Sequence, residues 1–152
     1  MNEMQPDPHR DDFAAWLSVV KTYALCEKAL TRALAPLQLS IPKNDVLMNI
    51  ARRPGLTQQR LADRLLVARS NVSMLLRDLE RDGLVSRRPC ATDGRVKELF
   101  LTDEGEALVA RSRPVQQAVV SHMLGVCSPG EVEQMAEVME RVAQSLRELL
   151  ED

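Results

Sequence analysis

The sequence predicts a mainly α-helical protein that carries one small β-hairpin. Apolar residues recur at i, i+3, i+4 and i+7 in several long segments, as they do along the buried face of a helix. Aromatic residues make up only 3% of the chain, which suits a helical protein with a Leu, Val and Met core. Two short extended segments, separated by the turn residues "PCATDG", interrupt the helical pattern and predict the hairpin.

Size and composition exclude several classes of protein. At 152 residues the chain is long enough for one domain, or for one domain with a dimerisation element. It has no apolar signal segment and no run of about 18 apolar residues, so we expect a cytoplasmic protein without membrane contact. Cys26, Cys90 and Cys127 form no CxxC pair and the two histidines are isolated, so we expect neither a metal site nor a cofactor. The sequence contains no phosphate-binding loop, nucleophile elbow or catalytic His/Asp/Cys set, and we do not expect an enzyme.

The first half of the chain predicts a short tail and three helices. Residues 1–10 are polar and are expected to form a mobile tail, followed by a long helix over residues 11–35. Ser40 is a suitable N-cap for a second helix, which has Pro42 in its first turn and stops at "RRPG". Thr57 caps a short third helix over residues 58–65.

The second half predicts a fourth helix, the hairpin and two long helices. The fourth helix covers residues 69–81, and Gly83 follows it where a left-handed residue costs least. The strands of the hairpin are residues 84–88 and 96–101. A fifth helix opens at Thr102 and runs to about His122 with a bend near Pro114, and "SPGE" at 128–131 fits a capping box for the last helix.

These elements predict two regions. Residues 40–101 form a lobe with a helix-turn-helix and a hairpin. Residues 11–36 and 102–150 form a helical region whose apolar faces we expect to be buried against a second copy of the chain. The alternative is that the outer helices pack only on their own domain.

Charge is distributed unevenly along the chain. Residues 52–97 hold eleven basic and five acidic residues, a net charge of +6, whereas the remainder carries −8. A basic centre between acidic arms is expected where one part of a protein meets phosphate and the rest does not. A mixed solvated surface is the alternative interpretation.

The fourth helix has the properties of a recognition helix. Val72 and Leu79 centre its apolar stripe, and the opposite face carries small, polar and basic residues. Short side chains allow close approach to DNA, and Arg can bind guanine or phosphate. The candidate contacts of this helix are Arg69, Ser70, Asn71, Ser73, Met74 and Arg77. The start of the preceding helix, with Thr57, Gln58 and Gln59, suits a phosphate oxygen.

The hairpin adds a second basic element beside this helix. Arg87, Arg88, Arg95 and Lys97 suit a wing that lies along the minor groove, where an inserted Arg responds to the negative potential. Asp93 would repel phosphate, so we expect it to hold Arg95 through an ion pair. The alternative is a solvated turn with incidental charges.

With these residues, the segment "GLTQQRLADRLLVARSNVSMLLRDLERDGLVSRRPCATDGRVKELFLTDEG" (55–105) resembles the winged helix-turn-helix core of the MarR family of bacterial transcription regulators. The shared motifs are LTQxxLA, xSxVSxLLxxLExxGLV, the RR pair, the DxR wing tip and LTxEG. The likeness extends over about residues 11–150. It implies a winged helix-turn-helix with long N- and C-terminal dimerisation helices. It also implies a homodimer that binds a pseudo-palindromic double-stranded DNA operator, with repression relieved by a small ligand or by oxidation.

The resemblance implies that recognition-helix contacts come from Arg69, Ser70, Asn71, Ser73 and Arg77. Wing contacts would come from Arg87, Arg88, Arg95 and Lys97, with Asp93 supporting Arg95. The chain departs from the family at Ala68, at Met74 and at Arg77-Asp78, where the family typically has a capping residue, a basic or polar residue, and Asp-Arg.

The signal that such a regulator senses is less defined. Asn44 and Asp45 lie early in the second helix, where an apolar pair is expected, and buried polar groups suggest a ligand site. Asp45 and Trp16 match a purine-sensing branch of the family, although Leu75 stands where that branch is basic. The alternative is that Trp16 belongs to the core and that Asp45 is solvated or caps the helix. Cys90, beside two arginines, is the candidate for oxidation, with an inert cysteine as its alternative.

A different class of function also fits a winged helix. The chain could be a protein-interaction module or anti-repressor that does not itself bind DNA. Such a protein need not keep Arg88, Arg95 and a polar helix face together, so their presence favours DNA.

Overall fold

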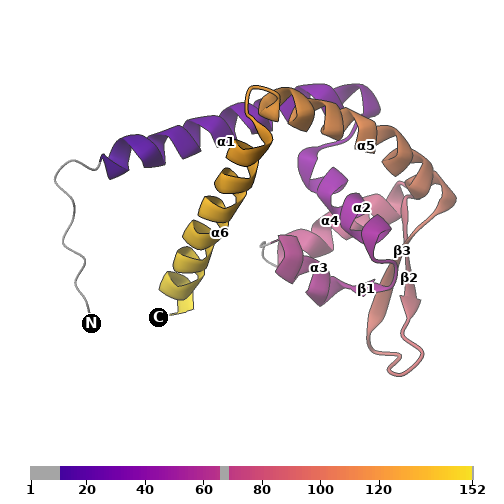
Figure 1. Cartoon of the computed structure of the whole chain (residues 1–152). Coiled ribbons are helices and arrows are strands. Elements are labelled where there is room, and N and C mark those ends of the chain that lie inside the picture. Colours follow the sequence, from indigo (N-terminus) through magenta and orange to yellow (C-terminus); the bar gives the residue numbers. More distant parts are fainter. Residues whose placement is uncertain (1–10, 66–68, 152) are drawn as a thin grey trace. The chain divides into compact units, whose positions relative to one another are not determined.

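The computed structural model describes residues 11–65 and 69–151 (Figure 1). The predicted mobile tail and residues 66–68 lie outside the described residues, as does the side chain of Arg69. The chain divides into two compact units, residues 1–116 and 117–152.

The first unit begins with α1 (Asp12–Leu34), which the Asp11 side chain caps by accepting a hydrogen bond from the Ala14 N–H at 2.8 Å. A short 3₁₀ turn (Ala35–Leu37) leads to α2 (Ile41–Arg52). Ser40 is the N-cap of α2, as predicted, and its hydroxyl accepts from the Lys43 N–H at 3.4 Å.

The next elements form the helix-turn-helix and the wing. Their order is β1 (Leu56–Thr57), α3 (Gln58–Leu65), α4 (Arg69–Arg81), β2 (Val85–Pro89) and β3 (Lys97–Leu101). Both helices have the predicted bounds. The left-handed Gly83 ends α4, and the Leu84 N–H reaches back to the Leu79 carbonyl at 2.9 Å. The predicted hairpin is therefore confirmed.

The sheet has one more strand than the sequence predicted. Its order is β1-β3-β2, and all pairs are antiparallel. Leu56 pairs with Leu99, which places β1 on the outer edge of β3. A strand of two residues is too short to show alternation, so its sequence carries no strand signal.

One apolar core holds these elements together. Its fully buried members come from α2, α3, α4 and β3: Val46, Leu47, Ile50, Leu61, Val72, Leu76, Leu79 and Leu99. Val72 and Leu79, the predicted centre of the stripe on α4, both face this core. The packing fixes which face of α4 remains for a partner.

α5 (Asp103–Leu124) begins where the sheet ends and continues through Pro114. The Thr102 hydroxyl accepts from the Gly105 N–H at 3.0 Å and donates to the Gly83 carbonyl at 2.6 Å, which ties the start of α5 to the end of α4. Gly105 packs so closely that an added Cβ would lie 2.1 Å from the Leu84 carbonyl oxygen.

α6 (Pro129–Glu151) completes the second unit. Its predicted capping box is confirmed: the Ser128 N–H donates to Glu131 at 2.7 Å and the Glu131 N–H donates to Ser128 at 3.3 Å. The Ser128 hydrogen bonds lower the pKa of Glu131. Among the described residues, no helix is long and apolar enough to cross a membrane.

Two outer helices expose large apolar side chains in the single chain. On α6 these are Met135, Val138, Met139, Val142, Leu146, Leu149 and Leu150, and on α1 they include Phe13, Trp16, Val20 and Tyr23. The alternative that Trp16 belongs to the core is wrong for this chain, because the side chain is 56% exposed and its ring packs on Phe13 at 5.2 Å between centroids.

Candidate nucleic-acid interface

The outward face of α4 carries the predicted set of polar and basic side chains. Ser70, Asn71, Met74 and Arg77 are exposed, whereas Val72 and Leu76 between them are fully buried. Met74 is 60% exposed although it is apolar. Arg69 is the first residue of α4, and its side chain lies outside the described part. The face therefore combines small groups at the helix start with a cation one to two turns further on.

The C-terminal end of α4 is tied to other parts of the lobe. Lys43 of α2 lies 3.7 Å from Asp78 and 3.6 Å from Asp82, and Arg81 pairs with Asp78 at 3.0 Å. These ion pairs are partly exposed and individually weak. They leave Arg77 as the basic side chain of α4 that has no partner in the described part of the chain.

Three of the predicted contact residues form a polar network inside the lobe. The Arg87 guanidinium on β2 donates to Glu80 of α4 at 2.8 Å and to Gln58 of α3 at 3.1 Å. The Gln58 amide donates in turn to the Ser73 hydroxyl of α4. All four side chains are half-buried. The network joins two helices and the wing, so the side chains of Gln58, Ser73 and Arg87 face one another and not solvent alone.

The rest of the start of α3 is arranged as the sequence predicted. The Thr57 hydroxyl accepts from the Arg60 N–H at 3.3 Å, which is the geometry of an N-cap. Gln59 is exposed. Thr57 also belongs to β1, so the sheet and the helix meet at this residue.

At the wing tip, Asp93 supports the turn through the backbone. Its carboxylate accepts from the Arg95 N–H at 3.0 Å, and the predicted ion pair with the Arg95 guanidinium is wrong. A carboxylate two residues earlier reaches the backbone N–H of a tight turn more easily than the end of a long side chain. Arg95 is exposed, and Lys97 donates to the Gly94 carbonyl at 3.4 Å.

Cys90 follows β2 at the base of the wing loop. It is half-buried, and its Sγ lies 3.2 Å from the Thr92 hydroxyl. The neighbouring Arg87 and Arg88 both point to other partners.

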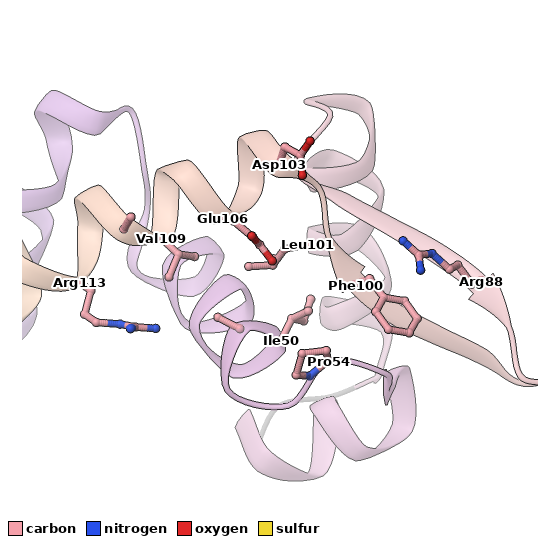
Figure 2. Close-up of a pocket in the computed structure, with 11 residues that line it drawn as sticks. Ile50, Pro54, Arg88, Phe100, Leu101, Asp103, Glu106, Val109 and Arg113 are labelled. Atoms are coloured by element: carbon pink, nitrogen blue, oxygen red, sulfur yellow. The ribbon is translucent and has the colours of Figure 1, made fainter.

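Arg88 lines a cleft on the sheet. Its guanidinium lies over the Phe100 ring, 4.4 Å from the centroid, which is a cation–π contact. Gly55, at φ +84°, lies on the ring as well: a Cβ added there would be 3.6 Å from the ring. The cleft has a volume of about 470 Å³ and is bounded by α2, β2, β3 and α5 (Figure 2).

The candidate effector residues Asn44 and Asp45 lie on α2. Asn44 is 1% exposed and donates to Gln116 of α5 at 2.9 Å, while its carbonyl oxygen has no partner in the described part of the chain. Burial raises the pKa of Asp45, and the charge of Arg52 offsets part of that effect. Trp16, the candidate on α1, packs its ring on Phe13.

Several residues at these sites were not predicted. Among them are Glu80, Phe100, Asp103, Glu106, Arg113 and Gln116. Each of these residues lies on a different element from the predicted residue that it contacts or with which it lines the cleft. Asn44 and Gln116, for example, are 72 positions apart. The periodicity of a single helix or strand cannot predict such contacts, and only Glu80, in the LExxGLV motif, carried a sequence signal.

Comparison with known proteins relates the chain to one group of regulators. The sequence profile of the MarR family matches residues 37–96. A HTH-type transcriptional regulator from Bacillus cereus is 30% identical over 106 residues, which are 70% of each chain. A HTH-type transcriptional repressor from Mycobacterium bovis is 26% identical over 132 residues, 87% of this chain and 95% of the relative.

The likeness extends to solved structures. A MarR family transcriptional regulator from Streptomyces coelicolor, solved in complex with DNA, superposes with a TM-score of 0.82 at 28% identity. The match covers 88% of this chain and 89% of that one, so it includes the outer helices as well as the lobe.

Proposed function

The chain is a member of the MarR family of transcriptional regulators, and we propose that it binds a pseudo-palindromic double-stranded DNA operator as a homodimer and represses transcription. The observation that carries this proposal is the exposed face of α4, with Asn71 and Arg77, beside a wing that ends in the exposed Arg95. The DNA-bound relative and the relative named a repressor support it. The proposal assigns the chain a binding role in the cytoplasm and no catalytic step.

In the proposed complex, α4 enters the major groove and Arg95 reaches the adjacent minor groove. Ser70, Asn71, Met74 and Arg77 face the bases or their phosphates, and Gln59 with the start of α3 faces the backbone. Gln58, Ser73 and Arg87 act mainly by holding α3, α4 and β2 together.

The proposed dimer is formed by residues 11–36 and 102–150. The exposed apolar side chains of α1 and α6 are the reason, since large apolar faces on a regulator need a partner. Pairing sets two recognition helices about 34–36 Å apart, which is one turn of DNA.

Release from the operator is proposed to follow a small molecule. Asn44, with a buried oxygen that has no hydrogen bond in the described residues, and Asp45, with its raised pKa, are the candidates for a ligand near α2, and Trp16 is the candidate on α1. Oxidation of Cys90 is the alternative trigger.

The test is a fluorescence-anisotropy titration of the full chain against DNA that flanks its own gene. A scrambled duplex is the control, and both are measured at two salt concentrations. The expected result is salt-sensitive binding that prefers the flanking DNA by about a hundredfold or more. Equal weak binding to both duplexes contradicts the proposal and favours a protein-interaction module.

A further inference from the structure

The cleft beside Arg88 has the size and floor of a small-molecule site. Its volume of about 470 Å³ lies within the range of about 300–1,000 Å³ found for ligand pockets. The floor is apolar and comes from three elements: Ile50 of α2, Leu101 of β3 and Val109 of α5. Such a floor suits the hydrocarbon part of a small organic molecule.

Four charged side chains surround this apolar floor. They are Arg88, Asp103, Glu106 and Arg113. All four side chains are exposed, and within the described part of the chain none of them forms an ion pair or a side-chain hydrogen bond. In this they resemble Arg77 and Arg95, whereas Lys43, Arg81 and Arg87 form ion pairs. The cleft therefore offers two cations and two anions whose partners are not supplied by the chain.

We propose that this cleft binds a small zwitterion with an aromatic body, of the aromatic amino-acid class. The rim of the cleft carries both signs of charge, so a ligand with a single charge would face side chains of its own sign as well as of the opposite sign. A carboxylate and an ammonium on one molecule can each face a side chain of the opposite sign. Glu106 and Arg113, on one face of α5, supply the acceptor and the donor (Figure 2).

The aromatic body is assigned to the other end of the cleft. Figure 2 shows Arg88 and Phe100 coming from the strands, with Ile50 and Pro54 between them and Arg113. The Arg88 guanidinium stacks on the Phe100 ring, and the ring packs against the backbone of Gly55. This packing fixes the position of the guanidinium. A guanidinium already held on one ring presents its second face to another aromatic ring.

The regulatory consequence rests on the proposed function. Arg88 is next to Arg87 on β2, and Arg87 holds α4 through Glu80 and α3 through Gln58. A ligand that fixes Arg88 therefore acts on the strand that positions the recognition helix. We expect the bound zwitterion to weaken operator binding, and operator DNA to weaken zwitterion binding by the same factor.

The site is tested by isothermal titration calorimetry of the full chain with L-phenylalanine and L-tryptophan. The single-charge comparators are 3-phenylpropanoate and phenethylamine. We expect the amino acids to bind about tenfold or more tightly than either comparator, because each lacks one charge-assisted hydrogen bond. Glu106→Gln and Arg113→Gln should each weaken amino-acid binding by about the same factor. Arg111→Gln, an exposed arginine of α5 outside the cleft, is the matched control and should bind normally.

Absence of binding by both amino acids overturns the proposal, as does an equal loss in Arg111→Gln. Binding of 3-phenylpropanoate as tightly as phenylalanine overturns the zwitterion assignment. The anisotropy assay without ligand tests operator binding separately. If the amino acids bind but the operator does not, the ligand site is supported and the proposed function is contradicted. If the operator binds but the amino acids do not, the proposed function is supported and the ligand site is contradicted.

Discussion

Arg87 has an internal role that its charge alone would not suggest. It bonds Glu80 and Gln58 and so joins β2 to α4 and α3. We predict that Arg87→Gln lowers operator affinity by about tenfold, because a charge-assisted hydrogen bond contributes about 1.5–3 kcal/mol. The slope of log affinity against log salt should stay unchanged, since no phosphate contact is lost. Anisotropy at several salt concentrations measures both quantities.

Arg95 is the matched control at the tip of the wing. Its side chain is exposed and, among the described residues, forms no hydrogen bond or ion pair, whereas its backbone N–H donates to Asp93. Arg95→Gln should lower affinity and also reduce the salt slope by about 0.9, the value for one phosphate contact. If Arg87→Gln reduced the slope of log affinity against log salt by the same amount, Arg87 would contact phosphate, which contradicts the prediction.

Asp45 gives a pH-dependent prediction. Burial raises its pKa above the ordinary value of 3.8, so the folded state binds a proton more tightly than the unfolded state does. The ionised carboxylate therefore costs stability at neutral pH, and that cost disappears as the pH falls below 3.8. Asp45→Asn should raise the melting temperature at pH 7 and have no such effect near pH 3. Thermal unfolding followed by circular dichroism measures it, and a larger gain in acid would contradict it.

At the scale of elements, α5 starts against the end of the helix-turn-helix. The contact depends on Gly105, because a Cβ would meet the Leu84 carbonyl oxygen at 2.1 Å. We predict that Gly105→Ala destabilises the fold by about 1–3 kcal/mol, the typical cost of overpacking. Urea unfolding measures this loss. Gly130→Ala, in the first turn of α6 with open space around it, is the control and should be neutral or slightly stabilising.

The elements differ in how well their sequences predict them. The helix over 69–81 is readable because Val72, Leu76 and Leu79 repeat at the helical period and Gly83 marks its end. The strand at Leu56–Thr57 cannot be predicted in this way, because it depends on pairing with the distant residues Leu99 and Glu98. The Arg87 network is missed for a related reason: its members lie on three elements, and basic residues near DNA-facing helices resemble phosphate contacts.

At the scale of the whole molecule, we propose that the outer helices govern assembly. Val142 and Leu146 lie on the apolar face of α6 and are about half exposed in the single chain. We predict that Val142→Glu with Leu146→Glu shifts the protein from dimer to monomer, which analytical ultracentrifugation measures. Operator affinity should fall by about a hundredfold or more, because each half-site then binds alone. Glu133→Gln, on an exposed position of the same helix, is the control. If the double variant remained dimeric, the dimer interface would not include this face of α6.

The pairing of β1 with β3 also has a consequence for how the protein is made. Leu56 leaves the ribosome 43 residues before its partner Leu99. At about 5–20 residues per second, that interval lasts about 2 to 9 seconds. During it, the apolar faces of α2, α3 and α4 lack the central strand that completes their core. We therefore expect a nascent chain that ends before Lys97 to be recognised by chaperones and proteases, and faster translation of residues 57–99 to shorten that exposure.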